Sequence, residues 1–478
     1  MFKNYIDCYR KLSLSKKAAI WYVFCNMLQK GIAFLVIPLY VRFLSTSEYG
    51  QYTIFQSWCN IIIIFATMNL YCGVFTKSMV DYSDDRDRYT STMQGLSTII
   101  TILLFTIYLM FQKWWHHYLE MDEVTTILMF LYFIAFPSFS FWAVRQRVEN
   151  KYLAMVGITL LQSVATPIIS ISLLFNTNLR ANAVIWGFLL TQTCFGLFFY
   201  FYHFIKCRCF FDKTYWLYAL KFNLPLIPHY LSLIVLGQVD RILIGRFCGK
   251  DKAAIYGLAF QVAMAINVVI SGINGSFVPW LYEKFKTKSF GIIKKQSNLL
   301  CLLVGVITVL AMLVAPEIIR IMGTREYYDA IWIIPPVCVG IYFQFCYGLF
   351  SCVEFYYSAT KYVMIATTSC ACLSVIINIL LLPKFGFLSA GYTSLICYTV
   401  FMLMHYSFMQ KVSKVKLDGI SIYDIRFIII TCSVQMLIMI TCLFLYYQNA
   451  IRYIVLSLML ISLVVIRNRF KTIINIKK

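Results

Sequence analysis

Two basic side chains lie within apolar runs of membrane length, and they are the residues best placed to bind an anion. Lys30 falls about halfway along the run 18–44, which contains no acidic residue, and Arg241 lies in a second run, 222–246. A Lys at the centre of a bilayer costs roughly 2.5–3.5 kcal/mol on insertion scales, and such residues usually face a wet cavity or a charged partner. The two cations therefore indicate a polar pathway that attracts anionic solutes.

Helical rise places these cations at different depths. At about 1.5 Å per residue, Lys30 lies about 18 Å below Arg42, and Arg241 lies about 7–8 Å below Arg246. Arg42 and Arg246 mark the outer ends of their spans. The sequence thus predicts a ladder of four substrate-binding cations from mid-membrane to the outer mouth.

Polar side chains follow the same helical faces as the cations. We predict that they line a central cleft: Asn26, Gln29, Gln56, Asn60, Asn223, Tyr230, Gln238, Asn267, Ser271, Asn274, Gln344 and Tyr347. The alternative for each is an interhelical hydrogen bond, worth about 0.6 kcal/mol on average. Asp240, Glu354 and His229 are candidates for proton or sodium coupling. Pairing between Asp240 and Arg241 stays open, because adjacent helical residues point about 100° apart.

Prolines interrupt the spans that carry the cations. Pro38 lies in the first run, and Pro225 and Pro228 lie in the run 222–246. Proline removes a helical hydrogen bond and bends the helix. Each bend is either a static kink or a hinge.

The elements that must position these residues are transmembrane helices. The 478 residues are 61% hydrophobic and 13% charged, against about 25% charged in a soluble domain. Long unbroken apolar runs favour helices over a barrel. We predict an all-α polytopic membrane protein with about 14 transmembrane helices. They lie near 18–43, 51–75, 90–112, 123–144, 153–175, 183–205, 222–246, 254–280, 298–320, 331–355, 362–382, 387–409, 426–447 and 450–466.

The basic residues set the orientation of these helices. With a cytoplasmic N-terminus, 30 of the 42 Lys and Arg residues fall in inside segments and 10 in outside segments. This bias predicts that both termini are cytoplasmic. It also accounts for the net charge of +22 without nucleic acid as a partner. The first run is too long for a cleavable signal peptide, so we expect none.

A short motif recurs in the two halves of the chain. Arg-Phe followed by Tyr-Gly occurs at 42–50 and at 246–257, six spans apart. This predicts two parallel six-helix lobes around a central cleft, plus two C-terminal helices. The expected parts are a cytoplasmic interfacial helix at 1–17, an N-terminal lobe at 18–206, a cytoplasmic linker at 207–221, a C-terminal lobe at 222–410, and two extra helices with a basic cytoplasmic tail at 411–478.

Metal, cofactor and catalytic groups are not expected. The 17 cysteines lie mostly inside apolar runs, and the pairs 207/209 and 370/372 lack a second cluster or nearby histidines. The acidic run 81–87 is interspersed with basic residues and is typical of a solvated loop. We therefore predict no metal site, no cofactor and no enzyme activity.

Several motifs resemble a known family. The stretch from Gln-Lys-Gly at 29–31 to Ser-Glu-Tyr-Gly at 47–50 resembles the opening of bacterial polysaccharide flippases. So do Leu-Pro-Leu-Ile-Pro-His at 224–229, Asp-Arg-Ile-Leu-Ile at 240–244 and Ser-Phe-Val-Pro-Trp-Leu at 276–281. Together they are similar to the O-antigen and capsule flippases of the multidrug/oligosaccharidyl-lipid/polysaccharide exporter superfamily.

The resemblance implies a function. Such proteins move oligosaccharide repeat units linked to polyprenyl diphosphate from the cytoplasmic to the periplasmic leaflet of the bacterial inner membrane. They do so by alternating access, for biosynthesis of lipopolysaccharide O-antigen or capsule, and cations in the cleft are thought to meet the diphosphate. The implied partners are this lipid-linked substrate, membrane lipids and other polysaccharide-assembly membrane proteins.

Three alternatives remain open. A cation-coupled multidrug exporter of the same superfamily would need acidic residues deep in its N-terminal lobe, where this chain has Asn26, Gln29 and Lys30. A membrane polysaccharide polymerase or glycosyltransferase would need a large outer loop or an acidic site at a membrane face. A non-transporting scaffold would leave the buried charges without a purpose.

Overall fold

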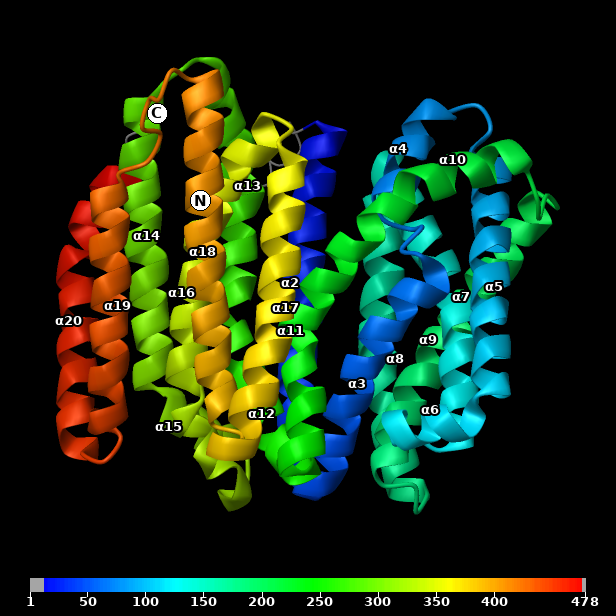
Figure 1. Ribbon diagram of the computed structural model, residues 1–478, viewed down its shortest axis with the longest axis horizontal. Coiled ribbons are helices and arrows are strands. Elements are labelled where there is room, and N and C mark those ends of the chain that lie inside the picture. The colour runs from blue at the N-terminus through cyan, green and yellow to red at the C-terminus, as the bar shows by residue number, and fades with distance from the viewer. Residues whose placement is uncertain (1–12, 475–478) are drawn as a thin grey trace, which may run out of the picture. The chain divides into compact units, whose positions relative to one another are not determined.

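The computed structural model of the chain describes the backbone of residues 13–474, which form helices and no strand (Figure 1). The prediction of an all-α membrane protein is confirmed. Within the described residues, ten helices are long and apolar enough to cross a membrane. The other predicted spans coincide with α3, α11, α18 and α20, so the count of 14 spans is not confirmed. The expected interfacial helix falls largely on residues 1–12, outside the described residues.

The chain divides into two compact units. Unit 1 comprises residues 1–257 and 367–386, and unit 2 comprises 258–366 and 387–478. α11 and the second half of α17 belong to unit 1. α11 packs along α3, and its side chains form hydrogen bonds with side chains of α17. The lobe boundaries 18–206 and 222–410 stay a prediction.

Unit 1 is built from helices of the N-terminal half of the chain. They are α2 (Leu14–Phe43), α3 (Thr46–Thr67), α4 (Gly73–Asp81), α5 (Arg86–Met110), α6 (Gln112–Leu119), α7 (Glu123–Val148), α8 (Tyr152–Asn176), α9 (Ala181–Lys206), α10 (Lys213–Asn223), the 3-10 turn η1 (Leu224–Leu226), α11 (Ile227–Cys248) and the first half of α12 (Lys250–Met264). The second half of α17 (Thr360–Phe385) completes the unit.

Unit 2 is centred on α16, whose residues are almost all buried. Its remaining elements are α13 (Ile266–Lys286), α14 (Phe290–Leu313), α15 (Ala315–Met322), η2 (Arg325–Trp332), α16 (Ile334–Tyr356), α18 (Ser389–Lys416), α19 (Ile425–Leu445) and α20 (Asn449–Ile474), with parts of α12 and α17. α16 packs along α18 (Figure 1). Arg452 of α20 donates to both carboxylate oxygens of Glu317 on α15, at 2.5 and 2.6 Å, and so ties the last helix to the unit.

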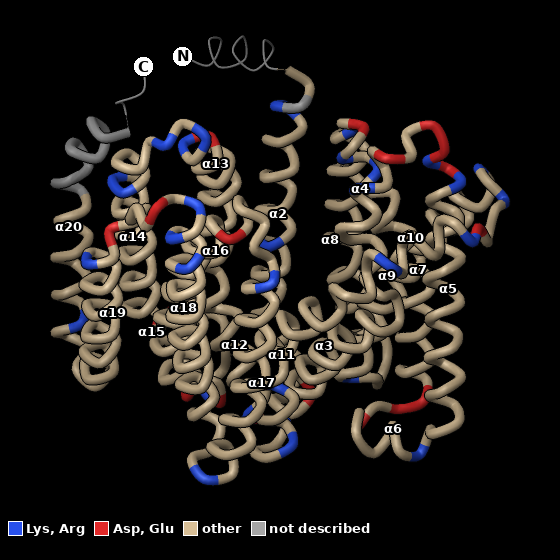
Figure 2. The backbone as a smooth tube through the Cα atoms, turned by 45° about the horizontal axis from the view of Figure 1, so that its top comes forward, with Lys and Arg blue, Asp and Glu red and all other residues tan. Residues whose placement is uncertain are grey.

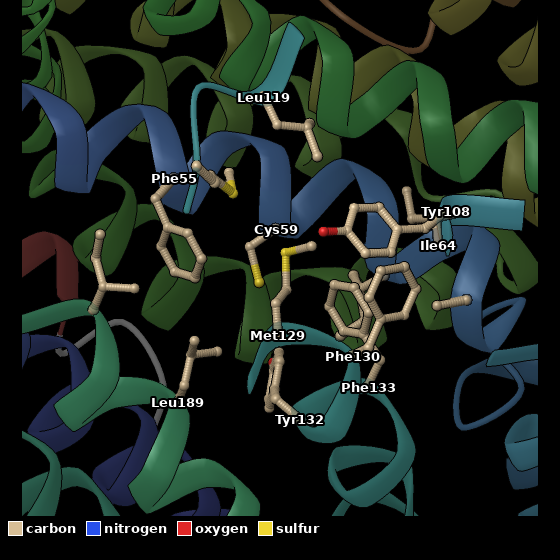
Figure 3. Close-up of a cluster of buried hydrophobic side chains, with 14 residues drawn as sticks. Phe55, Cys59, Ile64, Tyr108, Leu119, Met129, Phe130, Tyr132, Phe133 and Leu189 are labelled. Atoms are coloured by element: carbon tan, nitrogen blue, oxygen red, sulfur yellow. The ribbon is translucent and has the colours of Figure 1, made fainter. Parts of the chain in front are cut away.

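An apolar core joins α3, α7 and α9 in unit 1. Phe55 and Cys59 of α3 lie against Met129 and Phe133 of α7 and Leu189 of α9 (Figure 3). These residues are at most 5% exposed. This core fixes α3, and α3 in turn supports α11.

Several predicted spans are interrupted, and one of them, 298–320, is divided between α14 and α15 at Val314. The run 51–75 is not one helix, because α3 ends at Thr67 and α4 begins at Gly73. Met68 and Asn69 between them have φ values of 49° and 51°, in the left-handed region, which ends an α-helix. The run 254–280 is likewise divided, between α12 and α13 at Ala265.

The predicted prolines fall into two structural classes. Pro225 lies in η1, and Pro228 lies in the first turn of α11, so both mark the junction between α10 and α11. Proline suits this place because its missing N–H is not needed in a first turn. Pro38 lies inside α2, which continues to Phe43. A hinge role for any of them stays a prediction.

Charged residues gather at helix ends and in loops (Figure 2). In unit 1 the acidic run 81–87 is tied to neighbouring helices, since Arg145 of α7 bonds to Asp87 and to Glu149, the latter at 2.7 Å. Burial alone would raise the pKa of the Glu149 carboxyl, but its bonds to Lys151 and Arg145 outweigh burial and lower that pKa. These residues form a charged cap on the helix ends.

Candidate functional site

Lys30 is exposed on α2, and no other described side chain bonds to it. Asn26, one turn earlier, is also exposed. Gln29 turns toward α8, where its Nε2 donates to Ser163 Oγ at 3.2 Å. The predicted polar face of the first span is therefore divided, with Gln29 in helix packing and Lys30 open to its surroundings.

The two outer arginines, Arg42 and Arg246, are exposed near the ends of α2 and α11. The guanidinium carbon of Arg246 lies 5.3 Å from the centre of the Tyr118 ring of α6. Such a cation–π contact is worth about 0.5–1 kcal/mol at an exposed site. Arg246 therefore keeps its charge at the surface while α6 orients it.

Arg241 is buried, with 5% of its surface exposed. Its Nη1 donates to the Gln238 side chain, which lies 2.5 Å away, and to the Gly237 carbonyl at 3.3 Å. The same Gln238 oxygen accepts from Ser57 Oγ of α3 at 3.3 Å. A guanidinium, an amide and a hydroxyl thus link α11 to α3.

Asp240, next in sequence to Arg241, is 2% exposed and has its own partners. Its carboxylate accepts from Tyr256 of α12 at 2.6 Å and from Asn378 of α17 at 2.7 Å. Tyr256 belongs to the repeated Tyr-Gly motif, which was noted in the sequence without a role. Asn378 is missing from the sequence-based site, and its one signal is that it is an amide within an apolar run.

The other predicted residues of unit 1 lie on α3, at the end of α10 and in the first turn of α11. Buried Asn223 donates to the carbonyl of Met68, at the break between α3 and α4. His229 lies 3.0 Å from the Thr367 hydroxyl of α17. Gln56 bonds within its own helix, to Tyr52 at 3.1 Å. Asn60 and Tyr230 are half-buried.

Unit 2 holds the remaining predicted residues in two groups. Asn267 donates to Gln344 at 3.2 Å, and Ser271 donates to the Asn267 carbonyl at 2.6 Å. Asn274 is half-buried on the same helix. In the second group, Glu354 is paired with a histidine that was not predicted, His405, and Tyr347 stacks on its ring.

Comparison with known proteins decides the family. Residues 15–285, more than half of the chain, match the family model described as "Polysaccharide biosynthesis protein". The chain belongs to the polysaccharide biosynthesis protein family. Residues 225–380 also match the model named MatE. These matches place it, as a multi-pass membrane transporter, in the superfamily that the sequence motifs resemble.

Two curated relatives match short stretches of this family member. "Lsg locus putative protein 1" of Haemophilus influenzae is 29% identical over 143 residues, covering 27% of this chain and 36% of that protein. An "Uncharacterized membrane protein" of the same organism is 33% identical over 106 residues, covering 22% and 26%. The match thus spans about a third or less of either relative.

Solved structures show the fold of the family member. The lipid II flippase MurJ, in an inward closed conformation, aligns with a TM-score of 0.66 at 14% identity, over 94% of this chain and all of that chain. An outward-facing multidrug resistance MATE family transporter aligns with a TM-score of 0.58 at 13% identity, over 85% and 98%. At these identities the likeness concerns the fold alone.

The geometry separates the predicted site into local clusters. The structure brings Gln238, Asp240 and Arg241 together in unit 1, and pairs Asn267 with Gln344 in unit 2. It leaves Lys30 exposed on α2. Among residues 13–474, no three His, Cys, Asp or Glu side chains are placed to hold a metal ion. The arrangement of these clusters around one cleft stays a prediction.

Proposed function

We propose that the protein is a flippase for oligosaccharide repeat units linked to polyprenyl diphosphate. It moves them from the cytoplasmic to the periplasmic leaflet of a bacterial inner membrane by alternating access, for O-antigen or capsule biosynthesis. The observation that carries the proposal is Lys30, a cation exposed in the middle of an apolar helix and without a bonding partner among the described side chains. Membership of the polysaccharide biosynthesis protein family supports it.

The chemistry of the substrate suits such a cation. A diphosphate is anionic, and two unit charges 4 Å apart attract by about 4 kcal/mol at an effective dielectric constant of 20. Lys30 offers three N–H donors on a flexible stem. It acts as a point charge for the diphosphate, while the polyprenyl tail stays in lipid.

A multidrug exporter is the second candidate. The MatE match over residues 225–380 and the fold shared with MATE transporters favour it. Cationic drugs would be repelled by Lys30, so an anionic substrate fits this chain better. Resistance to cationic dyes on expression would support the exporter instead.

The first experiment follows polysaccharide in a deletion strain. The strain should accumulate polyprenyl-diphosphate oligosaccharide in the inner leaflet, and the wild-type gene should restore surface polysaccharide. The Lys30→Ala gene should restore at least about tenfold less surface polysaccharide than the wild-type gene. A loss of roughly 1.4 kcal/mol in binding free energy lowers a binding constant tenfold. Lys30→Arg, which keeps the charge, should restore more than Lys30→Ala.

Lys384→Ala is the matched control, because Lys384 is an exposed lysine near the end of α17. It should behave like the wild type, and immunoblots of membranes should show equal amounts of all variants. Normal surface polysaccharide with Lys30→Ala would remove Lys30 from the mechanism.

A further inference from the structure

A carboxylate and an imidazole are buried together in unit 2. Glu354 of α16 and His405 of α18 are both 0% exposed. His405 Nδ1 lies 2.9 Å and 3.0 Å from the two carboxylate oxygens of Glu354. Since an ionised carboxylate only accepts, Nδ1 is the donor in this pair. The bond joins two helices that pack along each other.

Aromatic rings enclose the imidazole. Tyr347 stacks on it with ring centres 5.1 Å apart and planes 19° apart, and Phe401 meets it edge-on at 4.7 Å. The second ring nitrogen, Nε2, is buried and has no hydrogen-bond partner among the described residues. His405 can therefore gain or lose a proton at Nε2 while Nδ1 keeps its bond to Glu354.

Within the part of the chain that the structure describes, His405 is the ion-pair partner of Glu354 and is charged only when it is protonated. The helices that pack on α16 and α18 carry further titratable side chains, which are Tyr282 of α13, Cys301 of α14, Cys352 and Tyr347 of α16, Tyr406 of α18, and Tyr423 before α19. The lysines of the adjoining helix ends, Lys361 and Lys411, are exposed. Tyrosines and thiols have ordinary pKa values of about 8.5 or higher, whereas an imidazole is the side chain whose ordinary pKa lies between pH 5 and 8.

A second ion pair in unit 2, formed by buried Arg452 and half-buried Glu317, provides the contrast. Arg452 is 0% exposed and is bonded to Glu317. A guanidinium does not lose its proton in a protein, so this pair carries fixed charges. A buried ion pair gives little net stability over apolar residues of the same size. What distinguishes Glu354–His405 is therefore proton exchange.

We propose that Glu354 and His405 form a proton-binding site, and that its loading and unloading couples proton movement to transport. One proton from water adds to Nε2 of neutral His405, and the carboxylate of Glu354 neutralises the resulting imidazolium. Release reverses this step, and no other bond forms or breaks. The coupling part rests on the proposed function, whereas proton binding does not.

The position of the pair fits this role. Glu354 lies two residues before the end of α16 at Tyr356, which is about 3 Å along the helix axis. Nε2 is closed off in this conformation, so loading requires a second conformation, as a coupled cycle demands.

The first test is a proton titration of the purified full-length protein. Between pH 5 and 8 the wild type should bind about one proton more than Glu354→Gln/His405→Gln, as expected for one histidine. His405→Arg keeps an ion pair but cannot exchange its proton, and it should lose the same proton. Glu317→Gln is the matched control and should titrate like the wild type. Identical curves for the wild type and both pair variants would overturn the site.

The second test concerns coupling. Lipid-linked oligosaccharide extracted from the deletion strain is incorporated into proteoliposomes, with and without an imposed pH gradient. The gradient should accelerate translocation several-fold with the wild type and with Glu317→Gln, but not with His405→Arg. Equal acceleration in all three would overturn coupling through this pair. If the wild type binds the extra proton in the first test but translocates no lipid-linked oligosaccharide in the second, the flippase function is contradicted. The proton-binding site would then still stand.

Discussion

Lys30 and Arg241 carry the same formal charge but lie in opposite surroundings. Lys30 is exposed, whereas Arg241 is 5% exposed and bonded to Gln238 and to the carbonyl of Gly237. A buried cation of this kind is held by several acceptors at once. Arg241 therefore stabilises the contact between α11 and α3 through Gln238, in addition to any role in substrate binding.

Replacing Arg241 separates charge from geometry. Arg241→Lys keeps the charge but loses the planar fork of donors, whereas Arg241→Ala leaves the half-buried Gln238 side chain with its bond from Ser57. We expect Arg241→Lys to restore more polysaccharide to the deletion strain than Arg241→Ala. Both variants are compared at equal membrane levels. Equal loss in both would show that the shape and donors of the guanidinium, and not the charge alone, are what function requires.

For single residues, the sequence predicted which side chains matter better than it predicted their hydrogen-bond partners. Asp240 and Glu354 stand out in apolar runs, so their importance was visible. Their partners Asn378 and His405 are 138 and 51 residues away, and no helical spacing connects them. Only packing of distant helices reveals such pairs.

Among the elements, the break between α3 and α4 shows what hydropathy misses. The run 51–75 remains apolar across the break, so composition predicts one span. The chain turns because Met68 and Asn69 adopt left-handed backbone and Asn223 bonds to the Met68 carbonyl. Asn favours this conformation modestly, but Met does not, so the turn at Met68 depends on the bond from Asn223 and on the bond from the Asn69 amide to the Thr67 hydroxyl.

Close packing of α8 against α9 depends on Gly187. A side chain at this position would overlap the backbone of Ser170 on α8. Gly187→Ala should therefore lower the free energy of unfolding by about 1–3 kcal/mol, as overpacking does. The midpoint of thermal unfolding in detergent measures this.

Gly157 on α8 is the matched control, because no atom lies within 4 Å of a side chain added there. Gly157→Ala should be neutral or slightly stabilising, since alanine favours helix by about 0.8–1.0 kcal/mol over glycine. Equal melting of both variants would show that α8 and α9 do not pack as described.

For the whole molecule, the sequence predicted the helical class but not the two units, and the orientation stays a prediction. Hydropathy identifies helices by composition, which is why α3, α11 and α18, with more polar residues, fall outside the ten apolar spans. Unit 1 combines residues 1–257 with 367–386. A repeat in the sequence divides the chain at one point and cannot predict that a segment of α17 joins the first unit.

The excess of Lys and Arg on one side predicts the topology of the molecule. A fluorescent reporter that folds only in the cytoplasm should be bright when fused after residue 212, in the predicted inter-lobe linker. Alkaline phosphatase, which is active only outside, should be active when fused after residue 180, between α8 and α9. The reverse pattern would contradict the assignment of cytoplasmic termini.

The bond between Asp240 and Asn378 has a consequence for synthesis of the chain. The two residues are 138 positions apart, and a ribosome adds roughly 5–20 residues per second. For roughly 7–28 s, then, the Asp240 carboxylate is already made while its α17 partner is not. α11 must be accepted by the insertion machinery before that amide exists. Assembly of unit 1 is thus completed only when α17, which is synthesised late, packs against α11, which is synthesised midway through translation.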